Sequence, residues 1–547
     1  MTQSQTAIDD DAGADLSSPL RVYPSSQPIR RGQALAEFVL IFAVFLVHGG
    51  LQPPAVNETN YLAKAKHYWD PQWCQGDLFL ESADAHAVFF WTCGWWTLWL
   101  SLPSVAILGR VLTYLALAWS WRRLSVAVLP VPWWSVLAAA LMAVLTSRVH
   151  MAGEWIVGGF EAKGFAYALV FLALEALVRG RWMRVWLLLG LATALHVLVG
   201  GWSMVAAGIA WLSLSGDADR PTLRNMLPSL FVAALIAAVG LIPTLRLDAG
   251  TPHEMIVRAA EIQVFERLRH HLNPEFFFIS GGIPTVFGLR FVALTIVCLG
   301  LWRLQTLSHN ARRLKQFVVA SLLIAAVGLL ICEAGTQVFN ARGATAWLLR
   351  FYWFRLADTM VPVGTALAIV SYLAQLRVRK PALATAALAL AMCVGGIPLM
   401  WETWQRAELG IPVGDRRLAP TSSRYADWLA VCDQASQMPP GTIFITPSGS
   451  QTFKWYAERP ESATWKEMPQ DAASIVHWWS RMVDIHGQLG NWQTPALRTV
   501  GELKALGNAH GADFLVCPSH PRIDLFCVYR NNSFAIYALK PVIVQPF

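Results

Sequence analysis

The chain has 547 residues, of which 55% are hydrophobic and 14% are charged, and its formal net charge is +8. Soluble globular proteins carry roughly 25% charged residues, so this composition excludes that class and indicates a polytopic membrane protein. The positive charge of such a chain collects in cytoplasmic loops, so it does not indicate a nucleic-acid partner.

The N-terminal segment 1–33 precedes the first apolar run and begins with a short acidic stretch, IDDDAGAD. It lacks the pattern of a cleavable signal peptide. Its polar composition cannot support a packed core. We therefore expect a disordered cytoplasmic tail.

The middle of the chain, 34–401, contains apolar runs near the length of about 20 residues that crosses a bilayer. The run at 87–119 fits either one long helix or two helices that turn at Ser101-Leu-Pro-Ser104. The runs are 34–51, 87–119, 131–147, 165–179, 183–199, 201–215, 228–245, 288–304, 317–333, 359–376 and 382–400.

The charges of the connecting loops predict the orientation of these runs. If 87–119 crosses once, the short arginine-rich loops all share the side of Arg30 and Arg31, and the bias of lysine and arginine makes that side cytoplasmic. About eleven helices follow, in a bacterial inner membrane, with the N-terminus inside and the C-terminus outside.

The C-terminal part, 402–547, changes character and alternates short β-branched or aromatic runs with helical patterns. This alternation predicts a small extracytoplasmic α/β domain. The expected strands are 442–446, 513–517, 525–529 and 534–539.

The first loop after the opening apolar run reads NETNYLAKAKHYW at 57–69. A carboxylate near membrane depth is costly to hold, so Glu58 is a functional candidate. Together with Tyr61 and the later Gly76-Asp77, it resembles the first outer loop of the C-type (GT-C) membrane glycosyltransferases. That family often shows Asp-Glu-x-x-Tyr here, so Asn57 stands where an aspartate is common.

This resemblance implies a multi-span fold, a sugar donor linked to a polyprenyl phosphate, and often a trailing outer domain. It implies a catalytic role for Glu58 and a substrate-binding role for Asn57 and Tyr61. The chain also resembles uncharacterised bacterial membrane proteins whose tail has a pattern like Thr452–Tyr456, then Trp465-Lys466 and Pro469. That second resemblance implies no chemistry.

A second acidic group in the first loop contains Asp77, Asp84 and His86. A metal-dependent transferase would use a pair of carboxylates here, so we take Asp77 as a second catalytic candidate and leave a divalent metal open. Capping of the following helix by Asp84 is the alternative. No residue is assigned as a metal ligand, and no cofactor is assigned.

Two further outer loops, 148–164 and 334–358, are expected to bound a cavity beneath the first loop. Guanidinium groups fork onto phosphate oxygens, which suits a lipid-phosphate leaving group. A binding role is not the only interpretation of these residues. Glu161 could form a solvated charge pair with Lys163, and His196 could only satisfy a backbone carbonyl. The substrate-binding candidates from these loops and the neighbouring helix hairpin are Glu154, Glu161, His196, Arg350 and Arg355.

Three functions are compatible with these features. The first is an integral-membrane glycosyltransferase that uses a polyprenyl-phosphate sugar at the outer face of the inner membrane. The second is a non-enzymatic membrane protein that docks an envelope partner through its outer domain, which Asn57 favours. The third is a transporter, which should show two related halves, and the sequence does not show them.

Overall fold

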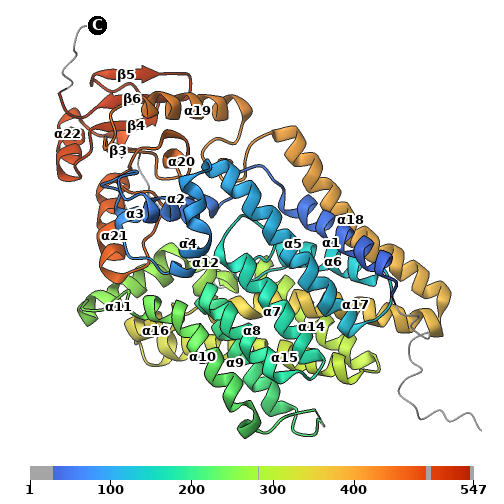
Figure 1. The fold of residues 1–547 in the computed structure, drawn as a ribbon. Helices are drawn as coiled ribbons and strands as arrows, with labels where there is room; N and C mark the ends of the chain where they lie inside the picture. Colours follow the sequence, from blue (N-terminus) through green and yellow to red (C-terminus); the bar gives the residue numbers. More distant parts are fainter. Residues whose placement is uncertain (1–28, 218, 281–282, 488–493, 542–547) are drawn as a thin grey trace, which may run out of the picture.

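The computed structural model describes residues 29–541 except 218, 281–282 and 488–493. Most of the predicted tail, residues 1–28, therefore lies outside the described residues. The described chain forms a helical body with a small sheet-containing unit at one end (Figure 1). This confirms the predicted class, an α-helical multi-span protein with a small C-terminal α/β unit.

The helical body contains long apolar helices that match the predicted runs. Seven described helices are long and apolar enough to cross a membrane, while α6, α7, α8 and α9 are shorter, so the count of eleven spans is not confirmed. The helices are α1 (Arg31–Gly49), α5 (Leu102–Val128), α6 (Trp134–Arg148), α7 (Ala162–Val178), α8 (Trp182–Leu195), α9 (Val197–Ser213), α10 (Leu223–Leu245), α14 (Val286–Leu304), α15 (His309–Glu333), α17 (Arg355–Arg379) and α18 (Pro381–Leu409).

The run at 87–119 forms two helical parts that meet at Ser101, as the second alternative predicted, and only the later part is a candidate span. A short helix α4 (Ala87–Cys93) and a 3-10 turn η2 (Gly94–Leu98) precede α5. The side chain of Ser101 caps α5 by accepting from the Ser104 amide at 3.4 Å, and a proline occupies the first turn. Both features favour a helix start at this point.

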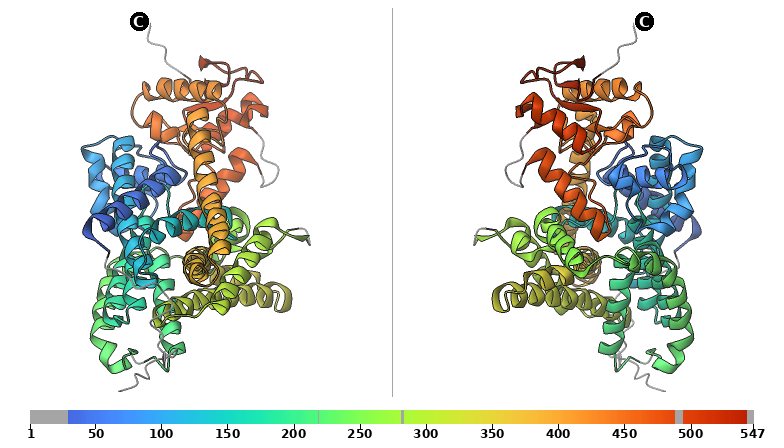
Figure 2. Two further views of the ribbon diagram at one scale, coloured as in Figure 1. Left: turned by 90° about the vertical axis from the view of Figure 1, so that its right-hand side faces the viewer. Right: turned by 90° about the vertical axis from the view of Figure 1, so that its left-hand side faces the viewer.

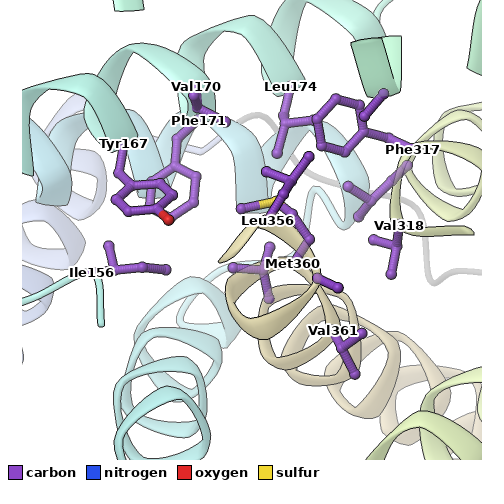
Figure 3. Packing of buried hydrophobic residues seen from close by; sticks show 14 of the residues in the cluster. Ile156, Tyr167, Val170, Phe171, Leu174, Phe317, Val318, Leu356, Met360 and Val361 are labelled. Atoms are coloured by element: carbon purple, nitrogen blue, oxygen red, sulfur yellow. The ribbon is translucent and has the colours of Figure 1, made fainter. Parts of the chain in front are cut away.

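Helix α17 lies at the centre of the body. Its apolar window is 89% buried, whereas the other six candidate spans are between 17% and 50% buried. A helix that is apolar all round belongs inside a bundle. Figure 3 shows Leu356 and Met360 of α17 packed between α7, represented by Phe171 and Leu174, and α15, represented by Phe317.

Shorter elements connect the long helices, and α2, α3, α11 and η3 among them contact the C-terminal unit. They are α2 (Glu58–Trp69), α3 (Leu78–Glu81), α11 (His253–Glu261), the π-helix η3 (Ile262–Arg267), α12 (Arg269–Leu272), α13 (Pro274–Phe277), the strand pair β1 (Ile279–Ser280) and β2 (Ile283–Pro284), the π-helix η4 (Ala334–Val338) and α16 (Arg342–Leu349).

The C-terminal unit begins after α18 and holds a four-stranded sheet in the order β3-β4-β6-β5. Strands β3 and β4 are parallel, and the other two pairings are antiparallel. All four predicted strands are present. The elements are α19 (Ser422–Ser436), β3 (Phe444–Ile445), α20 (Phe453–Ala457), α21 (Ala472–His486), η5 (Pro495–Leu497), α22 (Val500–Ala509), β4 (Phe514–Pro518), β5 (Cys527–Arg530) and β6 (Phe534–Ala538).

The C-terminal unit packs directly on the connecting elements, as the side views show (Figure 2). Helix α21 buries Ile475, Trp478 and Met482 against Ala259 and Ile262 of the α11–η3 segment. Apolar contact of this kind stabilises by roughly 25 cal/mol per Å² removed from water. The unit is therefore held against the end of the body where the first loop lies.

Candidate functional site

A cavity of about 1130 Å³ lies between the helical body and the C-terminal unit. Its wall includes parts of loops 148–164 and 334–358, which the sequence predicted to bound it, and Lys466 and residues 468–470 of the C-terminal unit. Six lysine and arginine side chains line it against three carboxylates, those of Glu154, Glu161 and Asp248. The excess of cations favours an anionic ligand.

Glu58 does not line this cavity, so the prediction that it faces a hydrated cavity is wrong. Its side chain is 0% exposed. Arg110 of α5 donates to both carboxylate oxygens at 2.5 Å, and the amides of Ala55 and Phe160 donate at 2.7 Å. These four hydrogen bonds fill the acceptor positions of a carboxylate. A Cβ at Gly159 would lie 2.9 Å from Glu58 Cγ, so a glycine lets the loop close over it.

The loop before α7 presents Glu154 to the cavity. Asp358, in the first turn of α17, accepts from the amides of Met151, Ala152 and Glu154 at 2.6 to 3.2 Å and so folds the loop back onto the body. Glu154 then contacts Lys163 at 3.0 Å and Arg355 at 2.8 Å. Burial alone would raise the pKa of Glu154, but these two cations outweigh it and hold the pKa below its ordinary value.

Glu161, which precedes α7, has a different environment. It is 2% exposed, accepts from Asn57 Nδ2 at 3.1 Å and lies 3.8 Å from Lys163 Nζ. Burial raises its pKa, although Lys163 and Asn57 act in the opposite direction. Of Glu154 and Glu161, the second is therefore the better proton acceptor.

Asn57 connects Glu161 to the C-terminal unit, because Lys466 Nζ donates to its Oδ1 at 2.7 Å. The amide thus accepts from a lysine on one side and donates to a carboxylate on the other. An aspartate could do only the first of these. This geometry gives the departure from the family pattern at position 57 a physical reason.

A row of aromatic and cationic groups continues along the wall. Tyr61 Oη lies 3.1 Å from His86 Nε2, and Arg355 Nη1 lies 3.4 Å from His196 Nε2. The two imidazole rings are 5.3 Å apart. Burial, with help from Arg355 and Lys64, lowers the pKa of His86 to about 4, so its ring is neutral at physiological pH. The row extends a polar surface from Tyr61 to the charges around Glu154.

Arg350 lines the same cavity on the segment between α16 and α17, where it contacts Asp248 at 3.1 Å. Asp248 also accepts from the amide of Ala472 at the start of α21. Seven of the nine predicted site residues therefore share one cavity, namely Asn57, Tyr61, Glu154, Glu161, His196, Arg350 and Arg355.

Asp77, the other predicted catalytic residue, lies away from the cavity wall. It caps α3 and contacts Lys454 of the C-terminal unit at 3.0 Å. Lys454 is fully buried and also contacts Glu461, at 3.0 Å, and Glu467. Burial raises the pKa of Glu467 well above its ordinary value, although Lys454 acts in the opposite direction. This position joins the first loop to the C-terminal unit.

Across the residues that the structure describes, no group of three or more His, Cys, Asp or Glu side chains is arranged to hold a metal ion. Asp84, which the sequence grouped with Asp77, instead lies 3.5 Å from Lys64. Lys64 and Lys454 thus form ion pairs with the carboxylates that a metal would need.

Sequence reasoning missed the partners that define the site. Arg110 lies inside the apolar run 87–119, and the sequence predicts no site role for it, for Arg267 or for Lys466. The sequence does mark Lys466, since this residue belongs to the Trp465-Lys466 pattern of the tail. Arg267 is turned into the cavity by a π-helix, an element that is frequent at functional sites.

Comparison with known proteins gives a short match and several distant structural likenesses. The model of a domain of unknown function (DUF6798) matches residues 426–485, which include Lys454 and Lys466. Curated proteins give no significant match.

Three solved structures are similar to this chain at low identity. The oligosaccharyltransferase of Archaeoglobus fulgidus in complex with zinc and sulfate is 12% identical, with a TM-score of 0.43 over 88% of this chain and 67% of that chain. AglB of the same organism, in complex with an inhibitory peptide and a dolichol-phosphate, is 13% identical, with a TM-score of 0.42 over 88% and 69%. ArnT of Cupriavidus metallidurans bound to undecaprenyl phosphate is 15% identical, with a TM-score of 0.41 over 94% and 98%. These scores lie below 0.5, so function is inferred from the cavity residues alone.

Proposed function

We propose that this chain is an integral-membrane glycosyltransferase that takes a sugar from a polyprenyl-phosphate donor at the outer face of a bacterial inner membrane. One observation carries the proposal. A buried carboxylate suited to accept a proton, Glu161, lies in the same cavity as guanidinium groups suited to a phosphate leaving group, those of Arg350 and Arg355.

The reaction needs a base, an acceptor and a charged leaving group. Glu161 takes the proton from an acceptor hydroxyl or amide, and the freed electron pair attacks the anomeric carbon of the donor sugar. The bond between that carbon and the phosphate oxygen breaks, and the phosphate leaves with the electron pair. Arg355 and Arg350 neutralise the charge that develops on the phosphate.

Glu154 has a positioning role in this scheme. Because Lys163 and Arg355 hold it ionised, it fixes the direction of the Arg355 guanidinium rather than accepting a proton. Lys163 also stacks on Trp155, with its Nζ 3.3 Å from the ring centroid. Lys163, which lies between Glu154 and Glu161, is thus held both by its ion pair with Glu154 and by the Trp155 ring.

The test is release of polyprenyl phosphate and transfer of sugar by the purified full-length protein in nanodiscs. Glu161→Gln keeps the shape but cannot take a proton, so the rate should fall by about 10² to 10⁴-fold. Glu458→Gln, at an exposed carboxylate remote from the cavity, should keep the full rate. Absence of release from every polyprenyl-phosphate sugar tried, or full activity in Glu161→Gln, overturns the proposal.

The pH profile gives an independent check. The base must be deprotonated, so the rate should fall as pH drops through the pKa of Glu161, which is raised above the ordinary glutamate value. This acid limb should vanish in Glu161→Gln. The same assay with and without EDTA decides whether a divalent metal takes part.

The proposed side of the membrane is tested separately. If the C-terminal unit faces the periplasm, a C-terminal alkaline phosphatase fusion is active and a C-terminal GFP fusion is dark. The reverse pair of results places the cavity on the cytoplasmic side and removes the outer-face part of the proposal.

A further inference from the structure

Two of the six cations on the cavity wall have no carboxylate partner among the residues that the structure describes. Lys64, Lys163, Arg350 and Arg355 each contact one at 2.8 to 3.5 Å. For Lys466 and Arg267, no carboxylate of the described residues lies within the 4.0 Å of an ion pair; their recorded partners are an amide and backbone carbonyls.

These two residues lie together, although they belong to different parts of the chain. Arg267 Nε donates to the carbonyl of Trp465 at 2.5 Å, and Nη2 donates to the carbonyl of Lys466 at 3.5 Å. The guanidinium also lies over the Trp465 ring, 5.0 Å from its centroid. The side chains therefore reach the cavity from a single junction between η3 and the C-terminal unit.

Arg267 is buried, with only 7% of its surface exposed, and Lys466 is partly buried. Burial lowers the pKa of Lys466 to about 7, with Arg267, Lys163 and the exposed Arg417 acting in the same direction and Glu161 in the other. Burial also lowers the pKa of Arg267 to about 10. Uncompensated cations are costly in such a place, and an anion that enters the cavity would relieve the cost.

We propose that Lys466 and Arg267 form a phosphate subsite at the junction between the C-terminal unit and η3. A planar guanidinium and an ammonium group offer the donors that phosphate oxygens take up as charge-assisted hydrogen bonds. The ligand is a phosphate monoester or diester, carried either by a lipid or by a water-soluble acceptor. The proposal deepens the glycosyltransferase function, on which it depends for the role of the phosphate, by adding a position separate from the ion pairs of Arg350 and Arg355.

Hydrogen bonds also connect the subsite to the proposed base, Glu161. Lys466 donates to Asn57, and Asn57 donates to Glu161, so one amide separates the phosphate position from the carboxylate. A phosphate that binds Lys466 is therefore held within reach of the reacting groups. The site is incomplete without the C-terminal unit, because that unit supplies the lysine.

The test measures the reactivity of each lysine in the full-length protein in nanodiscs, with acetic anhydride as a neutral reagent and peptide mass spectrometry as the readout. An amine reacts only when it is unprotonated, so Lys466 should react readily at pH 8. Bound phosphate raises its pKa, and a rise of about two units should slow acetylation of Lys466 by roughly tenfold. Lys66, paired with Glu458 outside the cavity, serves as the internal reference.

Three probes distinguish the sources of phosphate. Protection by inorganic phosphate supports a water-soluble ligand, and protection by farnesyl phosphate alone supports a lipid headgroup. Equal protection by farnesol, which has no phosphate, overturns the proposal, and so does a lack of protection by any probe.

Arginine variants test whether the second cation takes part. Arg267→Gln should remove the protection, whereas Arg267→Lys keeps the charge and should keep most of it. Arg269→Gln, at an exposed arginine two residues along, should change nothing. Full protection in a folded Arg267→Gln protein overturns the subsite. Since labelling does not require turnover, protection without sugar transfer refutes only the proposed function, and transfer without protection refutes only the subsite.

Discussion

Glu58 and Glu161 are both buried carboxylates around the same loop, yet their surroundings differ. Glu58 accepts four hydrogen bonds, two from Arg110 and two from backbone amides. Glu161 accepts one, from Asn57, and its nearest cation is 3.8 Å away. A carboxylate whose acceptor positions are all filled stabilises a fold, whereas one with positions left toward a cavity can take a proton.

The same contrast separates two lysines of the C-terminal unit, Lys454 and Lys466. Lys454 is enclosed by Asp77, Glu461 and Glu467, away from the cavity wall. Lys466, twelve residues later, reaches the cavity with only an amide partner. The unit therefore uses one lysine to attach itself to the first loop and offers the other to a ligand.

The largest effect is expected at the Glu58–Arg110 pair. Glu58→Gln leaves a buried guanidinium without its counterion, and breaking such a pair costs roughly 3–5 kcal/mol. We expect a large loss of folded protein, measured as the thermal midpoint of tryptophan fluorescence in detergent.

The matched control removes both charges. Glu58→Leu with Arg110→Leu should recover much of the stability, because replacing a buried pair by apolar groups is often neutral. Sugar transfer should return with the fold. A stable Glu58→Gln protein that has lost transfer would reverse the comparison and make Glu58 the base.

A smaller effect is expected at the lysine that attaches the C-terminal unit. Asp77→Asn keeps two carboxylates around Lys454 but weakens the contact with the Glu461 amide, which should cost about 1–3 kcal/mol. Limited proteolysis of the linker after α18 should then become faster. Glu467→Gln should cost less, since burial raises the pKa of Glu467 well above its ordinary value and so favours its neutral form. A larger effect from Glu467→Gln would show that all three carboxylates are ionised.

Local patterns predicted much of the fold and part of the site. Hydropathy located the long helices, and β-branched runs located all four strands, because both depend on neighbouring residues. Loop polarity likewise found Glu154, Glu161 and Arg355. The pairing of Glu58 with Arg110 and of Asn57 with Lys466 depends on tertiary packing across 52 and 409 residues of sequence. No local spacing encodes those contacts, and for this reason the prediction that Glu58 faces the cavity is wrong.

The smallest effect tests why position 57 is an asparagine. Asn57→Asp would give Lys466 a carboxylate partner, which raises the pKa of the lysine. It would also place a like charge beside Glu161, which raises the pKa of that carboxyl group. A rise of about one unit for Glu161 would move the acid limb of the transfer rate to higher pH and lower the rate near pH 7 by up to roughly tenfold. Acetylation of Lys466 at pH 8 should slow as well, and that measurement needs no turnover. Asn57→Ala, which adds no charge, should leave the Lys466 reaction fast. An unchanged pH profile and unchanged Lys466 reactivity in Asn57→Asp would show that the amide does not couple the lysine to the base.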